Sequence, residues 1–169
     1  MRSSAWLESS ENNMLTNKEI KKLVSLLAKI KNPHEGLPQP VFDALCGIVP
    51  FVACELVVVG KKGILLTWRE DKWWEGWHFP GGLLRYRESF DERIQKVAFD
   101  ELGINIISYK FLFPINYSQG VRCHSVSLVF LCKTAMIPKD GKFFKKMPKS
   151  IIESHKELWE KTIEMGYVC

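Results

Sequence analysis

The clearest pattern of hydrophobic and polar positions lies between residues 89 and 103. Apolar residues recur there at steps of three and four, the spacing of one helix face, and they are Phe90, Ile94, Val97, Ala98 and Leu102. Ser89 or Asp91 can begin this helix, and Gly103 is well placed to end it. Because the run Pro80–Gly82 precedes it, we expect a strand to end there in a turn with exposed backbone groups. The pattern predicts a loop of free carbonyl groups packed against a helix that carries carboxylates.

A second helical stripe lies near the N-terminus. Thr16 or Asn17 can cap a helix that extends through Ile30. Its apolar face is formed by Ile20, Leu23, Val24, Leu27 and Ile30. We expect this face to cover the rest of the chain or a partner subunit. A membrane-surface role is the lesser alternative, because the polar face is only modestly basic.

The polar segments around this helix divide the chain. Residues 1–15 are polar and serine-rich, and residues 32–40 form a turn-rich linker. We therefore expect an arm, helix and linker over residues 1–40 and one domain over residues 41–169. The start has no apolar core of a signal peptide, and no apolar run is long enough to span a bilayer. These features predict a cytoplasmic protein with no membrane partner.

Strand patterns fill much of the predicted domain. Phe51–Val59 is apolar on both faces, which predicts a central strand of the sheet, and Ile64–Trp68 returns after a glycine-flanked turn. Later segments read as strands over 104–113 and 123–132, as a polar loop over 114–122 and as a final helix over 151–165. Glu55 stands inside the most apolar strand and needs a partner, because burying a bare carboxylate is costly. That partner is either a cation of the fold or a group in a binding site.

Composition narrows the partners. The net charge is 24 minus 19, or +5, which suits an anionic partner, either a phosphorylated small molecule or nucleic acid. The basic stretch Lys139–Lys149 has a composition that can bind nucleic acid, but as one short loop it favours a solvated connection. The five cysteines match neither a zinc site nor a disulfide framework, so we expect free thiols.

The stretch after the glycines resembles the Nudix box, G-x5-E-x7-R-E-U-x-E-E-x-G-U, in which U is aliphatic. The matching positions are Gly82, Glu88, Asp100, Glu101, Gly103 and Ile104. Lys96 takes the place of the arginine and is the expected partner of Glu88, while Val97 replaces the following glutamate and Asp100 the first glutamate of the pair. The resemblance implies the α/β Nudix fold, an α/β/α sandwich around a mixed β-sheet, here with an added N-terminal helix. It also implies a Mg²⁺ cofactor, which Mn²⁺ could replace.

One Nudix branch, the GDP-mannose mannosyl hydrolases, has a box that likewise lacks some of the carboxylates. Residues 47–58, and Leu65-Leu66 followed by Arg69, are similar to that branch's segments. The resemblance implies that Arg69 binds the diphosphate and assists its departure, that Glu55 contacts substrate, and that His155 is the general base. Family members are commonly dimers, so a homodimer is a candidate assembly.

The metal shell and the loop after Arg69 complete the candidate site. The resemblance implies metal ligands at Gly81, Asp100 and Glu101; the branch's further acidic ligand is Ser154 here, and Glu153 is the expected substitute. Two aromatic side chains in the loop, Trp73 and Trp74, can stack on a base or sugar or can pack the loop itself.

These features favour hydrolysis of a nucleotide sugar such as GDP-mannose. One Mg²⁺ on the diphosphate and a neutral histidine suffice for water to attack the anomeric carbon, whereas attack on phosphorus needs the carboxylates that Val97 removes. Leu83 replaces an arginine of the branch, which weakens the expected grip on the diphosphate. Two alternatives stay open: a conventional pyrophosphatase using Glu88, Asp100 and Glu101, and a nucleotide-binding module without turnover.

Overall fold

The computed structural model describes residues 15–167. The arm expected over residues 1–15 falls almost entirely outside them. The helices and strands, in chain order, are α1 (Asn17–Leu27), α2 (Gln39–Cys46), β1 (Phe51–Gly60), β2 (Gly63–Glu70), β3 (Glu75–His78), β4 (Gly81–Leu83), α3 (Phe90–Leu102), β5 (Ser108–Tyr117), β6 (Ser125–Lys133), β7 (Lys142–Phe144) and α4 (Lys156–Glu164). Short 3-10 turns lie at Pro33–Glu35 and Glu153–His155. No helix of the described chain has the length and apolar content needed to cross a membrane.

The sheet is mixed, as the resemblance implied. Its strand order is β3-β2-β1-β6-β5, with β4 paired to β1 and β7 paired to β2. β1 and β6 run parallel, and the other pairs are antiparallel. Six consecutive residues of β1 are buried, which confirms it as the central strand. This strand carries Glu55 into the middle of the sheet.

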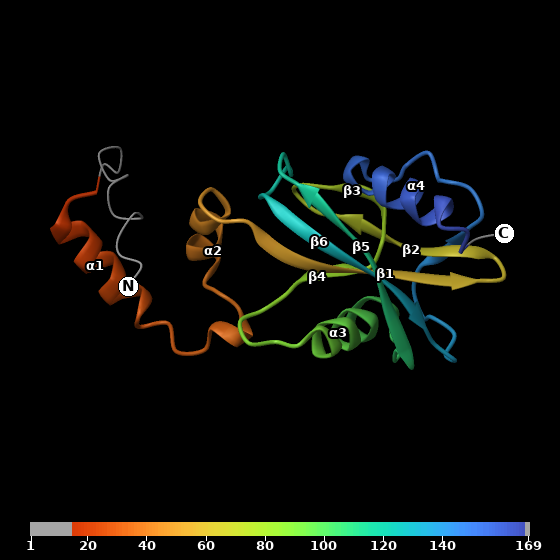
Figure 1. Cartoon of the computed structure of the whole chain (residues 1–169), viewed down its shortest axis with the longest axis horizontal. Helices are drawn as coiled ribbons and strands as arrows, with labels where there is room; N and C mark the ends of the chain where they lie inside the picture. Colours follow the sequence, from red (N-terminus) through yellow and green to blue (C-terminus); the bar gives the residue numbers. More distant parts are fainter. Residues whose placement is uncertain (1–14, 168–169) are drawn as a thin grey trace, which may run out of the picture.

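Helices cover both faces of the sheet (Figure 1). α3 packs on one face through Ile94, Val97, Ala98 and Leu102, and these contact side chains of β1, β2 and β6. α4 packs on the other face, where Leu158 and Trp159 join a second cluster with Phe79 and Val129. The expected α/β/α sandwich is confirmed.

Helix α3 has the predicted ends. Ser89 caps its first turn and forms a reciprocal capping box with Glu92. Gly103 closes it in the left-handed conformation, with φ of 63°. The helix that carries the box residues is thus fixed at both termini by its own sequence.

Strand β5 differs from the sequence prediction. The strand expected over residues 104–113 begins later, at Ser108, and runs through Tyr117, so Pro114 and Asn116 lie in a strand and not in a loop. β5 is an edge strand of the sheet, the setting in which a proline is tolerated because one side of the strand needs no ladder partner.

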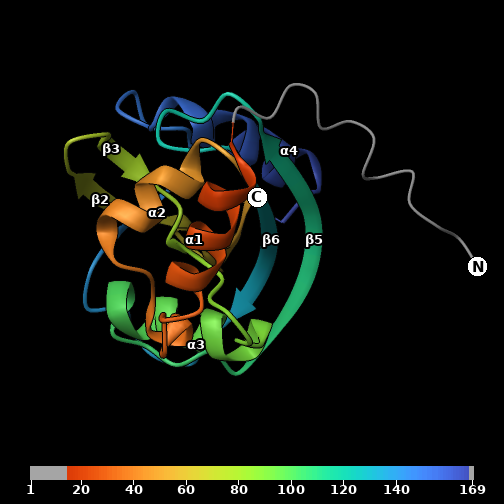
Figure 2. The ribbon, with the colours of Figure 1, turned by 90° about the vertical axis from the view of Figure 1, so that its left-hand side faces the viewer.

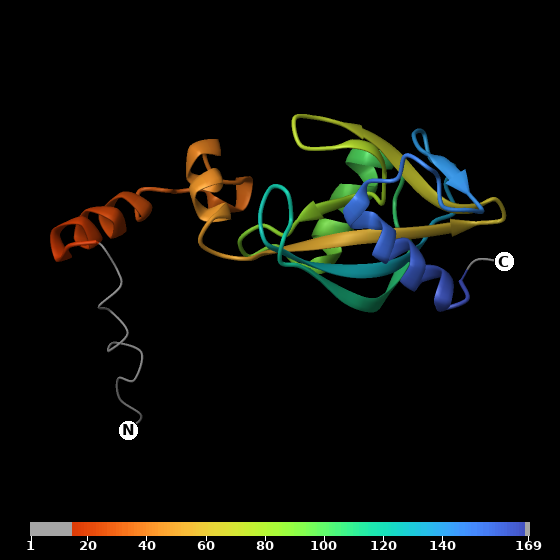
Figure 3. The ribbon, with the colours of Figure 1, turned by 90° about the horizontal axis from the view of Figure 1, so that it is seen from above.

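The N-terminal helix stands apart from the sandwich (Figures 1 and 3). Thr16 caps it through a capping box with Glu19, and it ends at Leu27, one turn earlier than expected. No residue of α1 is buried, and the stripe residues Ile20, Leu23, Val24 and Leu27 are exposed. The expectation that this stripe covers the rest of the same chain is wrong. Coverage by a partner subunit stays a prediction.

Candidate active site

One cavity of about 760 Å³ collects most of the predicted site residues. Its walls come from β1, the β2–β3 connection, β4, the β5–β6 connection and the turn before α4. The predicted residues that line it are Glu55, Arg69, Trp73, Trp74, Gly81, Glu153 and His155. Two predicted residues, Asp100 and Glu101, are not among the lining residues. The volume lies in the range of small-molecule sites.

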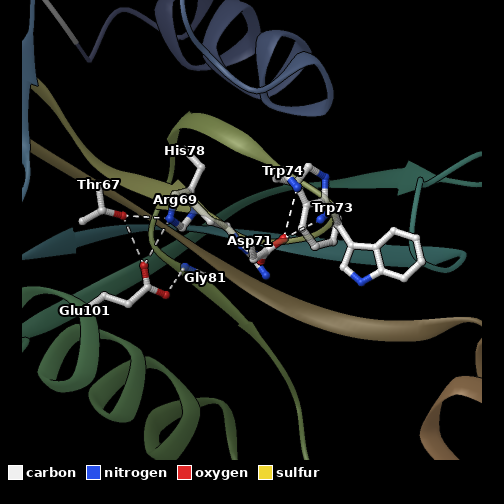
Figure 4. A network of polar contacts seen from close by, with 8 residues as sticks. All are labelled: Thr67, Arg69, Asp71, Trp73, Trp74, His78, Gly81 and Glu101. Atoms are coloured by element: carbon white, nitrogen blue, oxygen red, sulfur yellow. Dashed lines mark hydrogen bonds and ion pairs between the residues drawn. The ribbon is translucent and has the colours of Figure 1, made fainter. Parts of the chain in front are cut away.

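Glu101 reaches the edge of this cavity through hydrogen bonds (Figure 4). Its Oε1 accepts from the backbone N–H of Gly81 at 3.1 Å, and its Oε2 accepts from the Thr67 hydroxyl at 3.2 Å. His78 places its Nε2 3.0 Å from the Thr67 hydroxyl and 3.6 Å from Glu101. The carboxylate of α3 is therefore positioned against Gly81, as the sequence predicted. The turn expected at the glycines is wrong, because Gly81 and Gly82 belong to β4 and pair with β1. We name the short β3–β4 junction that ends at Gly81 the glycine turn.

The surroundings of Glu101 disfavour its negative charge. Burial raises its pKa to about 7, against the lowering effect of the hydrogen bonds from Gly81 and Thr67. The neighbouring His78 is largely buried too, and burial lowers its pKa to about 4, so its ring is neutral at pH 7. A cation placed beside Glu101 would stabilise the ionised carboxylate.

The remaining box residues point elsewhere. Asp100 lies on the solvent side of α3, where Lys96 Nζ pairs with it at 2.8 Å. Glu88 accepts two hydrogen bonds of 2.8 Å from the guanidinium of Arg93. The expected pairing of Lys96 with Glu88 is wrong, because Lys96 sits one turn before Asp100 on an exposed face while Arg93 is buried beside Glu88.

The apolar box position is part of the core. Val97 is 4% exposed and packs with the α3 face of the sheet. A Cβ on Gly82 would lie 3.1 Å from its Cγ2, so the side chain fills the space against β4. Among the box carboxylates, Glu101 alone is directed to the glycine turn.

Glu55 is the buried carboxylate of β1. Its Oε1 accepts from the Ser127 hydroxyl at 3.1 Å, and its Oε2 has no hydrogen-bond partner among residues 15–167. No ion pair within residues 15–167 involves it, and burial raises its pKa to about 8. Any Cβ at Gly81 would collide with its carboxyl group, so glycine is required opposite Glu55. The first of the two expected partners of Glu55, a cation of the fold, is therefore not found within residues 15–167.

Arg69 lines the cavity at the end of β2. Its Nε donates to Asp71 at 2.7 Å, and its guanidinium lies 4.3 Å from the ring centre of Trp74 (Figure 4). Asp71 also accepts from the backbone N–H groups of Trp73 and Trp74. Trp74 therefore packs its own loop, while the side chain of Trp73 is 38% exposed.

His155 is held by a backbone hydrogen bond. The N–H of Phe79 lies 3.0 Å from its Nδ1, and because a backbone amide can only donate, this nitrogen is the acceptor and the proton of the neutral ring is on Nε2. Burial, His78 and Arg69 lower its pKa to about 3. In this geometry His155 offers a donor to the cavity and lacks the free lone pair that a general base needs.

A family model described as NUDIX domain matches residues 50–160. The chain belongs to the Nudix hydrolase family. A curated relative, the low-salt glycan biosynthesis protein Agl8 of Haloferax volcanii, is 32% identical over 75 residues, which cover 44% of this chain and 48% of that protein. The chain thus matches about half the length of this relative.

Solved Nudix structures share the fold at low identity. A MutT NUDIX hydrolase from Burkholderia pseudomallei is 21% identical with a TM-score of 0.59, covering 67% of this chain and 98% of its own. The MutT protein from Methanosarcina mazei is 15% identical with a TM-score of 0.57, covering 71% and 98%. These likenesses concern the fold.

Nudix hydrolases generally use divalent metals such as Mg²⁺, and the donors here suit a sparsely held ion. Within residues 15–167 no three His, Cys, Asp or Glu side chains gather into a metal site. Glu101 and the glycine turn at Gly81 provide a carboxylate and backbone oxygens, and Mg²⁺ commonly takes one or two carboxylates together with substrate phosphates. The elevated pKa of Glu101 agrees with a position that a cation would complete.

Several site residues carried no signal in the sequence. Thr67 and His78 face each other across the β2–β3 ladder, and Ser127 lies beside Glu55 through the parallel β1–β6 pairing. Tyr117 and Arg122 also line the cavity. Strand pairing and the β5–β6 connection bring these side chains to the site, and no local sequence pattern states how the strands pair.

Proposed function

We propose that this protein hydrolyses a nucleoside diphosphate linked to a sugar, with water attacking the anomeric carbon. One observation carries the proposal: of the box carboxylates, only Glu101 is directed to the glycine turn, while Val97 is in the core and Asp100 is paired with Lys96. A site with one such carboxylate suits a single divalent ion held by Glu101, Gly81 and the substrate's phosphates.

The two possible reactions place different demands on that site. Attack on phosphorus requires a water activated beside the phosphate, commonly by two metals. Attack on the anomeric carbon leaves the phosphorus untouched and needs the charge of the departing diphosphate to be stabilised. A divalent ion, when bound, would supply part of that stabilisation. Because only one box carboxylate, Glu101, is directed to the site, attack on the anomeric carbon is favoured.

The chain's own residues supply the rest. Arg69 lies in the cavity wall with its guanidinium oriented by Asp71 and Trp74, where it can bind the diphosphate and its growing charge. His155, with its proton on Nε2, donates to a ligand oxygen. Glu55, whose raised pKa keeps it protonated at neutral pH, offers a hydroxyl donor to the sugar, and the exposed face of Trp73 can stack on base or sugar.

The attacking water must lose a proton to a carboxylate other than Glu55. We assign this role to Glu153, which lines the cavity two residues before His155 and is widely exposed, with one carboxylate oxygen paired to Lys156 and the other open to the water. Another histidine, His124, is not assigned this role, because its Nε2 lies 2.7 Å from Asn116 Oδ1 and it does not line the cavity. The water oxygen bonds to the anomeric carbon, the bond from that carbon to the diphosphate breaks, and Glu153 takes the proton. The products are a nucleoside diphosphate and free sugar.

The curated relative supports a sugar-linked substrate. Agl8 is named for glycan biosynthesis, a process that draws on activated sugars, and a nucleotide sugar is a compound of that class. The matched 75 residues include about half of that protein, so the relation supports the substrate class and leaves the base and sugar to experiment.

A second candidate is a conventional Nudix pyrophosphatase, which breaks the bond between the two phosphates. It is favoured by the state of His155, whose Nδ1 is occupied by the Phe79 amide, because the expected base for carbon attack is thereby engaged. In this reaction Glu101 would act with metals at phosphorus, and the product would be a nucleoside monophosphate.

Product analysis separates these functions. The protein is incubated with Mg²⁺ and, in turn, GDP-mannose, ADP-ribose and a set of nucleoside triphosphates, and the nucleotides are resolved by ion-exchange chromatography. We expect GDP and free sugar from GDP-mannose. A nucleoside monophosphate would establish the pyrophosphatase, and retention of ligand without any product would establish a binding module.

A further inference from the structure

The cavity holds all the buried side-chain atoms that lack a hydrogen-bond partner within residues 15–167. They are Glu55 Oε2, Tyr117 Oη and Arg122 Nε, and each belongs to a residue that lines the cavity. A buried polar atom without a partner is costly, and such atoms are rare in folded proteins. Their gathering around one cavity marks it as the place in the described fold where polar groups are left unpaired by the protein itself.

Arg122 is the cation of this group, and aromatic packing orients it. Its guanidinium lies 4.5 Å from the ring centre of Phe42 in α2. Phe42 in turn packs on Phe51, at the start of β1, with ring centres 4.9 Å apart. α2 precedes the domain strands and lies beside the sheet's end (Figure 1), in front of the sheet when the molecule is viewed from that end (Figure 2), so this part of the N-terminal segment helps to fix one wall of the cavity.

The charge of Arg122 is not neutralised by the protein's described residues. No ion pair within residues 15–167 involves it. The other arginine of the cavity wall, Arg69, is paired with Asp71. Leu83 lines the same cavity and provides no charge. Arg122 is therefore the cavity's available cation.

We propose that Arg122, oriented by Phe42, binds the diphosphate of the substrate. An arginine presents several N–H donors in a planar fork, which matches the oxygens of a phosphate. A ligand phosphate would accept from the guanidinium and pair its charge, which no described residue does. The assignment rests on the proposed function for the identity of the substrate, and it makes Arg122 a binding residue that compensates for the uncharged Leu83.

Binding without turnover tests this assignment. The dissociation constants of GDP, guanosine and inorganic pyrophosphate are measured by calorimetry with Mg²⁺ for wild type, Arg122→Gln and Arg122→Lys. We expect Arg122→Gln to weaken GDP and pyrophosphate about 10- to 100-fold and to leave guanosine unchanged. Arg122→Lys, which keeps the charge and loses the fork, should fall between.

Two further variants control for packing and surface charge. Phe42→Leu should weaken GDP by about 2- to 5-fold, because it removes the ring that orients the guanidinium. Arg87→Gln is the matched control: Arg87 also lies over an aromatic ring, that of Tyr86, at 5.1 Å, but is not among the cavity-lining residues. It should leave all three constants unchanged. Thermal melting establishes that each variant is folded.

Equal weakening of guanosine and GDP by Arg122→Gln would overturn the proposal, since the contact would then be to base or ribose. Unchanged binding of GDP, or a wild-type protein that binds none of the three probes, would overturn it too. Tight GDP binding that depends on Arg122, in a protein that does not cleave GDP-mannose, would instead retain this assignment and refute the proposed hydrolysis.

Discussion

The two walls of the cavity differ in how their polar groups are satisfied. On the α3 side, Glu101 accepts hydrogen bonds from Gly81 and Thr67, and the other box carboxylates have cation partners of their own. On the side of β1 and the β5–β6 connection, Glu55, Tyr117 and Arg122 each keep a buried atom without a hydrogen-bond partner among residues 15–167. The box carboxylates thus have protein partners, whereas these three residues keep atoms that the described protein does not pair. Chemistry and recognition are thus assigned to different walls.

The largest expected effect comes from the box carboxylates. Glu101→Gln should lower kcat on the order of 10² to 10⁴, because it removes the one carboxylate directed to the glycine turn. Asp100→Asn, the adjacent change on the same helix, should leave kcat within about twofold, since Asp100 pairs with Lys96 on the solvent side. Steady-state rates with Mg²⁺ measure both. Comparable losses for the two variants would mean that both carboxylates serve the site.

Restoring the box consensus should damage the fold. Val97→Glu places a carboxylate at a position that is 4% exposed and packed against Gly82. We expect a loss of about 2 to 5 kcal/mol of unfolding free energy in urea titrations and no gain in pyrophosphatase activity. Phe99→Glu, on the exposed side of the same helix, is the control and should cost less than about 0.5 kcal/mol. A stable and more active Val97→Glu protein would show that position 97 can face the site.

The β1 side of the cavity should be sensitive to pH through Glu55. Burial raises its pKa from 4.5 to about 8, so its contribution to stability is complete below pH 4.5 and is lost as pH rises through 8. Glu55→Gln removes this titration, and its unfolding free energy relative to wild type should improve by about 1 to 4 kcal/mol between pH 4.5 and 9. Parallel pH profiles for the two proteins would show that Glu55 ionises freely in the fold.

The smallest effect is expected from the N-terminal helix. Deleting residues 1–31 removes α1, none of whose residues is buried, while α2 and Phe42 remain. The unfolding free energy should change by less than about 0.5 kcal/mol, and GDP affinity should stay the same. A large loss of stability in this deletion would place α1 against the domain, and a changed mass in light scattering would identify its stripe as a subunit contact.

Local sequence signals predicted the box residues on α3, whereas the other site residues depend on contacts between parts of the chain that are far apart in the sequence. Ser89, Gly103 and the spacing to Glu101 are near one another in sequence, so capping and helix periodicity placed them correctly. Tertiary contacts decided what remained: Arg93 took the role expected of Lys96, and the amide of Phe79, 76 residues before His155, set that ring's tautomer. Arg122 and Phe42 are far apart in the sequence and meet only in the folded structure, and no local pattern marks their contact.

Hydrolysis of GDP-mannose in ¹⁸O-water tests the central claim most directly. The GDP product is isolated and weighed by mass spectrometry, because its phosphate oxygens do not exchange with water as the anomeric oxygen of a free sugar can. Attack on the anomeric carbon leaves every phosphate oxygen in place, so we expect GDP without label. Label in a phosphate of the nucleotide product would contradict the account, since the water would then have attacked phosphorus.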